Sequence, residues 1–94
     1  MNVIARSRLT GYWKKYRDSK SQLEAWYQEA DKASWDGPQD VKRRYPSASI
    51  LHDNVVVFNI KGNKYRLVVK IQYESRMVLV KWFGTHADYD KQVF

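Results

Sequence analysis

His86 is the residue best placed to move a proton in this chain of 94 residues. It follows Gly84 and Thr85 at the end of an expected strand, where a side chain lies at the rim of a sheet. Imidazole titrates near neutral pH, so it can serve as a general acid or a general base. A single histidine is more often an ordinary surface residue, so His86 is a candidate, and its role as acid or base stays open.

A row of positive charges lies earlier in the chain. On an expected strand from residue 64 to residue 74, Lys64, Arg66 and Lys70 fall on one face, and alternate positions lie about 6.6 Å apart. This spacing is comparable to that of phosphates along an extended RNA strand. Any solvent-facing strand can carry Lys and Arg, but residues 54–94 hold seven of these and only three Asp and Glu. The row is therefore a candidate phosphate-binding site.

Other kinds of catalysis lack their motifs. The chain has no cysteine, which excludes disulfides and thiolate metal sites, and around its two histidines no close-spaced set of His or carboxylate residues resembles a hydrolytic metal site. A Gly-x-Ser-x-Gly elbow and a phosphate-binding glycine loop are also missing. We expect no cofactor and no metal. Metal-independent acid–base chemistry remains, and RNA suits it because the 2′-hydroxyl of RNA is its own nucleophile.

The amino-acid composition limits the kinds of partner that the protein can bind. The net charge of +7, from 17 Lys and Arg against 10 Asp and Glu, favours an anionic partner such as nucleic acid, an acidic protein or a membrane surface. The apolar runs are too short to span a bilayer, and the first residues lack a hydrophobic signal core. We expect one domain over residues 1–94, in the cytoplasm and without membrane attachment.

The first half of the chain reads as helices. Apolar residues recur at helical spacing over 9–16 and again over 23–30, which predicts a helical hairpin joined near residues 18–20. Ser21 and Glu24 have the spacing of a capping box at the start of the second helix. Pro38 suits the first turn of a short third helix, which Pro46 ends.

The second half reads as strands. A β-branched run at 55–60, a turn at 61–63, an alternating segment at 64–74 and an apolar run at 77–83 predict an antiparallel meander. Residues 86–92 form a short helix or an irregular tail. The fold class is α+β, with the N-terminal helical hairpin packed on a small antiparallel sheet.

The aromatic residues divide into two groups. Trp13, Trp26 and Tyr27 lie on the helical stripes and are expected to pack in the core. Trp82 and Tyr73 are less certain, because the apolar run at 77–83 does not reveal which face of its strand is buried. Either ring could stack on a nucleobase.

Three stretches of the chain, at residues 45–51, 57–67 and 84–91, closely resemble HigB-type toxins of the RelE-like superfamily. The most specific are Asn-Ile-Lys-Gly-Asn-Lys-Tyr-Arg-Leu, from residue 59, and Gly-Thr-His-Ala, from residue 84. The resemblance implies a RelE-like microbial RNase fold and a ribosome-dependent endonuclease that cuts mRNA in the ribosomal A site. It also implies a HigA-type helix-turn-helix antitoxin, through which alone the toxin would reach operator DNA.

The resemblance also suggests roles for individual residues. His86 matches a histidine that several members use for proton transfer, and Arg66 matches an arginine that stabilises phosphate. Lys61 and Lys64 fall where other members hold basic groups, and Tyr89 is a looser match to an aromatic residue near the C-terminus. Some members carry further lysines on the strand at 55–60, so the division of acid and base roles does not transfer.

Two other functions remain open. The chain could be an RNA- or ribosome-binding module that keeps the fold without cleaving RNA. A DNA-binding protein is less favoured, because no helix-turn-helix is evident and the helices carry aromatic stripes suited to packing on a sheet.

Overall fold

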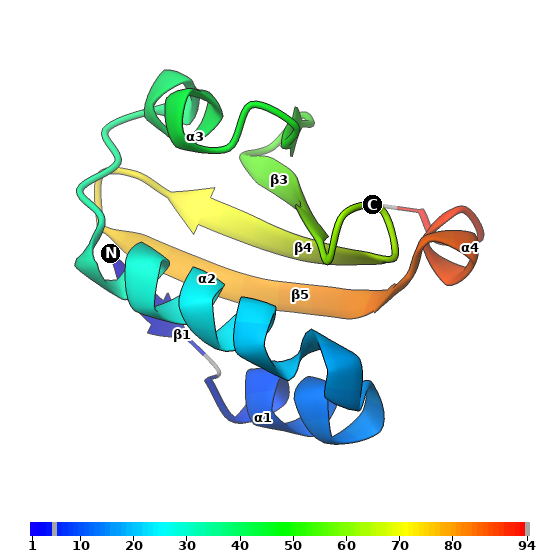
Figure 1. Cartoon of the computed structure of the whole chain (residues 1–94). Coiled ribbons are helices and arrows are strands. Elements are labelled where there is room, and N and C mark those ends of the chain that lie inside the picture. Colours follow the sequence, from blue (N-terminus) through cyan, green and yellow to red (C-terminus); the bar gives the residue numbers. More distant parts are fainter. Residues whose placement is uncertain (5, 94) are drawn as a thin grey trace.

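The sheet is the centre of the fold, and the N-terminal helical hairpin lies on one side of it (Figure 1). The computed structural model describes residues 1–4 and 6–93. The elements, in chain order, are β1 (Asn2–Ile4), α1 (Arg6–Lys15), a 3-10 turn η1 (Arg17–Ser19), α2 (Lys20–Lys32), α3 (Pro38–Arg44), β2 (Ser49–Ile50), β3 (Val55–Ile60), β4 (Tyr65–Gln72), β5 (Met77–Thr85) and α4 (His86–Tyr89).

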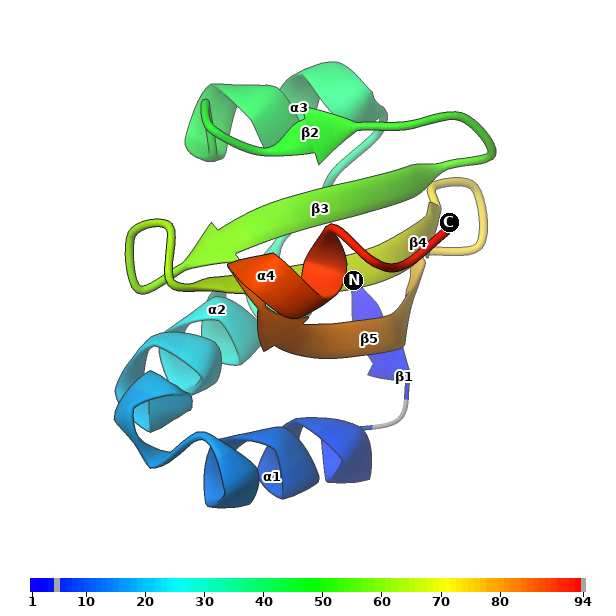
Figure 2. The ribbon, with the colours of Figure 1, turned by 90° about the vertical axis from the view of Figure 1, so that its right-hand side faces the viewer.

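The predicted meander of β3, β4 and β5 is confirmed, and both neighbouring pairs are antiparallel. Two short strands extend it into a five-stranded sheet of order β1-β5-β4-β3-β2. Figure 2 shows them at opposite edges, with β2 beside β3 and β1 beside β5. β1 runs parallel to β5, with Val3 opposite Val78. Strands of two or three residues are too short for a periodic pattern, so the sequence did not predict them.

The helical hairpin covers one face of the sheet. Leu9 of α1 and Leu23, Trp26 and Ala30 of α2 are buried in a single apolar core, which also holds Phe58 of β3. Trp26 is therefore in the core as expected, and Trp13 and Tyr27 are partly buried against it. The core forms because the apolar stripes of both helices face the inward-pointing residues of the strands.

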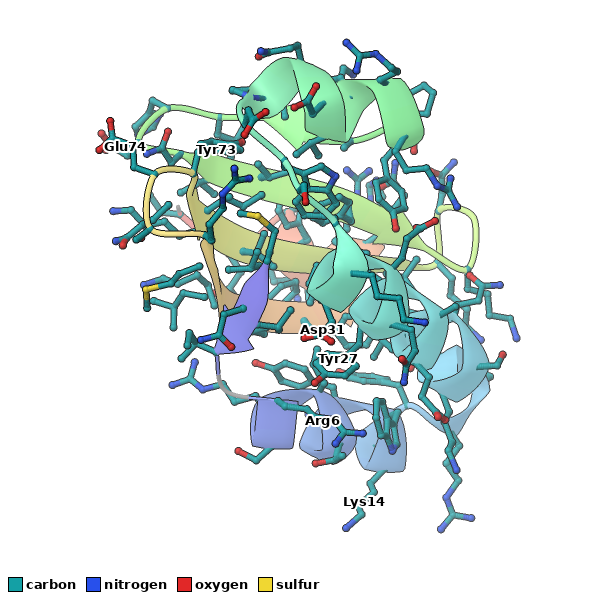
Figure 3. The ribbon with its side chains drawn as sticks, turned by 90° about the vertical axis from the view of Figure 1, so that its left-hand side faces the viewer. Arg6, Lys14, Tyr27, Asp31, Tyr73 and Glu74 are labelled. Atoms are coloured by element: carbon teal, nitrogen blue, oxygen red, sulfur yellow. The ribbon has the colours of Figure 1, made fainter. Side chains whose placement is uncertain are left out.

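The start of α2 differs from the expectation. The helix begins at Lys20, so Ser21 lies inside its first turn and the predicted capping box is wrong. Ser19 precedes the helix, and its hydroxyl donates to the Tyr16 carbonyl oxygen rather than capping α2. The Arg6 guanidinium of α1 lies 4.8 Å from the centre of the Tyr27 ring of α2 and so joins the two helices (Figure 3).

Strand β5 contains a bulge that the sequence did not reveal. Val68 of β4 lies opposite Trp82, but Val69 lies opposite Val80, so Lys81 is an extra residue in β5. An extra residue shifts the alternation of side chains by one. Val80 therefore faces the helices before the bulge, and Trp82 points away from them after it. Among residues 1–4 and 6–93, no helix is both long enough and apolar enough to cross a membrane.

Candidate functional site

The candidate site lies on the face of the sheet opposite α1 and α2, which we call the open face. Because Phe58, Leu67 and Val69 point into the core, their strand neighbours point to the open face. Arg66 occupies its centre line, paired in register with Asn59 of β3 on one side and Gly84 of β5 on the other. This placement follows from the alternation predicted for β4.

Arg66 is grouped with two aromatic rings. Its guanidinium carbon lies 5.2 Å from the centre of the Tyr89 ring, and the Tyr89 ring lies 6.2 Å from that of Trp82. Gly84 makes room for this group, since a Cβ atom at that position would lie 2.7 Å from the Trp82 ring. Arg66 Nε is buried and has no hydrogen-bond partner among the described residues. A guanidinium held this way can bind a phosphate through paired hydrogen bonds.

His86 is the first residue of α4 and follows directly on β5. Its backbone N–H donates to the Lys64 carbonyl oxygen at 3.1 Å, which fixes it beside the start of β4. Its Nδ1 lies 3.3 Å from a carboxylate oxygen of Asp90, one helical turn later, while 45% of the side chain stays exposed. Asp90 can therefore hold Nδ1 and leave Nε2 for a substrate.

Sequence reasoning missed Asp90 as a partner of His86. The signal was available, because residues four apart on a helix lie on the same face. The four-residue helix α4 places them so, and Thr85 caps it by accepting a hydrogen bond from the Asp88 N–H at 3.1 Å.

Lys64 does not share the open face with Arg66, so that part of the prediction is wrong. Lys64 belongs to the turn before β4, and its ammonium pairs with the carboxylate of Asp18 in η1, on the helical side. Tyr65 donates its hydroxyl to the same carboxylate, and the Lys61 ammonium lies 3.7 Å from it. Asp18, in the turn of the helical hairpin, therefore pairs with both Lys61 and Lys64.

Asp18 itself was not identified from the sequence. Hydrogen bonds from Lys64 and Tyr65 lower the pKa of its carboxyl to about 2, and the hydrogen bond to Asp18 raises the pKa of Lys64. Asp18 and Lys64 are 46 positions apart, and no local pattern links residues at such a separation.

The remaining candidates lie apart from one another. Lys70 is on the open face, but four positions along β4 from Arg66, beside Ile4 and Leu79. Of the two rings left open by the sequence, Tyr73 packs against the core, where burial raises the pKa of its hydroxyl. Trp82 is the ring on the open face. The described residues include no group of three His, Asp or Glu side chains arranged to share a metal ion.

Comparison with known proteins identifies the family. The HigB toxin family, described as a RelE-like toxic component of a toxin–antitoxin system, matches residues 19–92. The mRNA interferase toxin HigB of Escherichia coli (strain K12) is 29% identical over 92 residues, covering 96% of this chain and 88% of that protein. The mRNA interferase HigB of Shigella flexneri matches to the same extent. The mRNA interferase HigB of Escherichia coli O6:H1 (strain CFT073) is 22% identical over 93 residues, which are 97% of this chain and 90% of that protein.

These matches confirm the resemblance seen at residues 45–51, 57–67 and 84–91. They extend over nearly the whole chain. The chain therefore belongs to the HigB toxin family, whose members are RelE-like toxic components of toxin–antitoxin systems.

Proposed function

We propose that this protein is an mRNA endoribonuclease, the toxin of a type II toxin–antitoxin system, and that it stops translation by cutting messages in the ribosomal A site. The main observation behind the proposal is Arg66, half-buried on the open face beside two aromatic rings, with His86 directly after the adjoining end of β5. The family and the names of the relatives support the same function.

The reaction needs no metal ion. The 2′-oxygen of one nucleotide attacks the adjacent phosphorus, the bond to the 5′-oxygen breaks, and the products are a 2′,3′-cyclic phosphate and a 5′-hydroxyl. Arg66 binds the phosphate and stabilises its added charge in the transition state. His86 moves a proton, either from the 2′-hydroxyl or to the leaving 5′-oxygen. Tyr89, over Arg66, is the nearby aromatic hydroxyl that can assist.

The lysines contribute charge at different distances. Lys70 lies four residues along β4 from Arg66 and suits the phosphate of a more distant nucleotide. Lys61 and Lys64 border the site, but their ammonium groups lie against Asp18, so they act on RNA only when they leave that carboxylate. We therefore propose that Lys64 takes part in catalysis only after its ammonium group has left Asp18.

The partners follow from the same proposal. A HigA-type antitoxin with a helix-turn-helix domain holds the toxin inactive, and the toxin reaches operator DNA only through it. The net charge of +7 suits work on ribosome-bound mRNA in the cytoplasm. The proposed partners include no membrane.

Primer extension on an mRNA bound to ribosomes tests the function. With the purified protein added, we expect discrete cuts within codons at the A site, and no cuts when the protein is omitted. A parallel reaction without ribosomes tests whether cleavage requires them. An unbroken message on ribosomes to which the protein is demonstrably bound would contradict the proposal and favour a non-catalytic RNA- or ribosome-binding module.

A further inference from the structure

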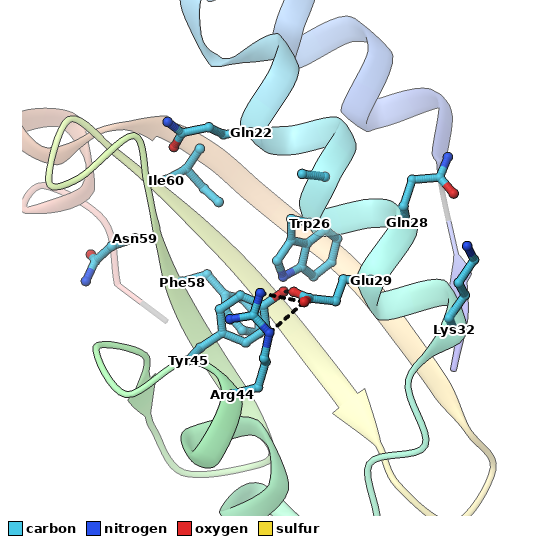
Figure 4. A pocket seen from close by; sticks show the side chains of 11 residues that line it. Gln22, Trp26, Gln28, Glu29, Lys32, Arg44, Tyr45, Phe58, Asn59 and Ile60 are labelled. Atoms are coloured by element: carbon cyan, nitrogen blue, oxygen red, sulfur yellow. Dashed lines mark hydrogen bonds and ion pairs between the residues drawn. The ribbon is translucent and has the colours of Figure 1, made fainter.

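A groove lies between helix α2 and the edge of strand β3, on the helical side of the sheet (Figure 4). Its volume is about 530 Å³, which is ample for a bound segment or ligand. On the α2 side the groove is lined by Ala25 and Trp26, and on the β3 side it is lined by Phe58 and Ile60. Tyr45, which follows α3, lines one end. Its floor is aromatic, since the rings of Trp26 and Tyr45 lie 5.4 and 5.0 Å from that of Phe58. We call it the α2–β3 groove.

A buried hydrogen-bond donor faces this groove without an acceptor. Trp26 is only 3% exposed, and its indole Nε1 has no hydrogen-bond partner among the described residues. Figure 4 shows the indole nitrogen pointing into the groove. The nearby carboxylate of Glu29 is already occupied by Arg44 and by the Tyr45 hydroxyl. A buried N–H group normally has an acceptor, so the groove lacks one that a partner can supply.

The backbone edge of β3 along the groove is also unpaired. β2 pairs only with Val56 and Val57, and the Leu51 N–H donates to the Val55 carbonyl oxygen at 2.8 Å. Backbone groups alternate in direction along a strand, so those of Asn59 point to the same edge as those of Val55. Beyond the end of β2, the Asn59 side chain donates to the Ser47 carbonyl oxygen at 3.2 Å, but no backbone hydrogen bond joins the Asn59 N–H or C=O to this segment among the described residues. Such an edge is a template for an added strand.

The rim of the groove is positively charged. Lys32 of α2 has no ion-pair partner among the described residues, and Arg44 stays 60% exposed even though it pairs with Glu29. Glu29 is the groove's only acidic lining residue in the part of the chain that the structure describes, and it is already paired. An acidic segment therefore complements this rim better than a basic one.

We propose that the α2–β3 groove receives a short, extended, acidic segment of the antitoxin. The segment adds to β3 as a strand at Asn59 and supplies a side-chain acceptor to Trp26 Nε1. The inference rests on the proposed toxin function, and it assigns the antitoxin a surface on the opposite side of the sheet from Arg66. Gln22, whose side chain now accepts the Lys61 N–H, gives way to the added strand.

Filling the groove tests the proposal. Ala25 is exposed on α2, so Ala25→Arg places a long side chain in the groove without disturbing the core. Ser21→Arg is the matched control, because Ser21 is exposed on the same helix and does not line the groove. Titration calorimetry uses the antitoxin polypeptide encoded with this toxin, purified from the complex. We expect Ala25→Arg to weaken binding by at least about tenfold, with Ser21→Arg like wild type and mRNA cleavage unchanged in both.

Two further measurements test whether the antitoxin segment binds in the groove as an added β-strand. Trp26→Phe keeps a ring in the core but removes the N–H, and we expect it to weaken antitoxin binding by about tenfold. We expect the Asn59 amide hydrogen to exchange quickly in the free toxin and slowly in the complex. Unchanged exchange at Asn59 despite a loss of binding by Ala25→Arg would overturn the added strand and indicate a helical or side-chain contact instead.

The failures of the two proposals are distinguishable. If wild-type toxin cuts mRNA and binds the antitoxin, but Ala25→Arg binds it equally well, the groove assignment is wrong and the function stands. If wild-type toxin neither cuts mRNA nor binds the antitoxin, both proposals are overturned.

Discussion

Arg66 is the residue on which the proposed chemistry depends most. It combines a position on the open face, a buried Nε and an aromatic ring 5.2 Å away. Arg66→Lys keeps the charge but loses the planar fork that binds two phosphate oxygens. We expect mRNA cleavage to fall by about 100-fold or more, with little change in thermal stability. Single-turnover cleavage on ribosomes measures this, and a variant with wild-type rate would remove Arg66 from the mechanism.

His86 provides a second test at this scale. Positioned acid–base groups contribute about 100- to 10,000-fold to a rate, so His86→Ala should lose cleavage by a factor in that range while still binding the antitoxin. His52→Ala is the control, because the His52 side chain is exposed and its imidazole lies 3.9 Å from the Asp53 carboxylate, away from Arg66 in the sequence and in the sheet. Equal cleavage rates for both variants would show that His86 does not transfer the proton.

Single residues were predicted from the sequence where local geometry decided their position. Arg66 and the inward face of β4 follow from alternation, and His86 follows from the end of an expected strand. Lys64 was misplaced, because its partner Asp18 lies 46 positions away. Contacts between residues so far apart in the sequence depend on how the helices and strands pack, and local sequence patterns do not predict them.

At the scale of elements, Asp18 joins the turn of the helical hairpin to the start of β4. Its carboxylate accepts hydrogen bonds from Lys64 and Tyr65, and the Lys64 carbonyl in turn accepts from His86. Lys64 therefore links Asp18, in the turn of the helical hairpin, to His86, the proposed proton-transfer residue.

This connection predicts a pH dependence of stability. The pKa of Asp18 is lowered from 3.8 to about 2 in the folded protein. A lowered pKa means that the stabilisation is present above about pH 4 and is lost as the pH falls toward 2. Asp18→Asn should lower the melting temperature at neutral pH, and the difference from wild type should shrink below pH 4. A difference that stays constant down to pH 2 would contradict the role assigned to Asp18.

The elements that the sequence missed share a physical cause. β1 and β2 are short edge strands that exist because β5 and β3 offer them partners. The bulge at Lys81 is likewise decided by packing, since it turns Phe83 toward the core and Trp82 toward the open face. In contrast, α1, α2 and the meander have long apolar patterns, and these were predicted correctly.

For the whole molecule, the excess of positive charge sets how RNA binding responds to salt. The net charge is +7, and Lys70 on the open face extends the charge away from Arg66. Each phosphate contact on single-stranded nucleic acid adds about 0.7 to the slope of log affinity against log salt. Lys70→Ala should therefore reduce that slope by about 0.7, measured by RNA binding across a salt series. An unchanged slope would mean that Lys70 contacts no phosphate.

In the proposed reaction, RNA is cut by its own 2′-hydroxyl, with Arg66 and His86 acting from the open face. The most direct measurement is cleavage of a ribosome-bound mRNA that carries a single 2′-deoxynucleotide at the mapped cut position. We expect this message to stay intact, while the all-ribose message yields a 2′,3′-cyclic phosphate and a 5′-hydroxyl. Equal cutting of the two messages would contradict cleavage by the 2′-hydroxyl.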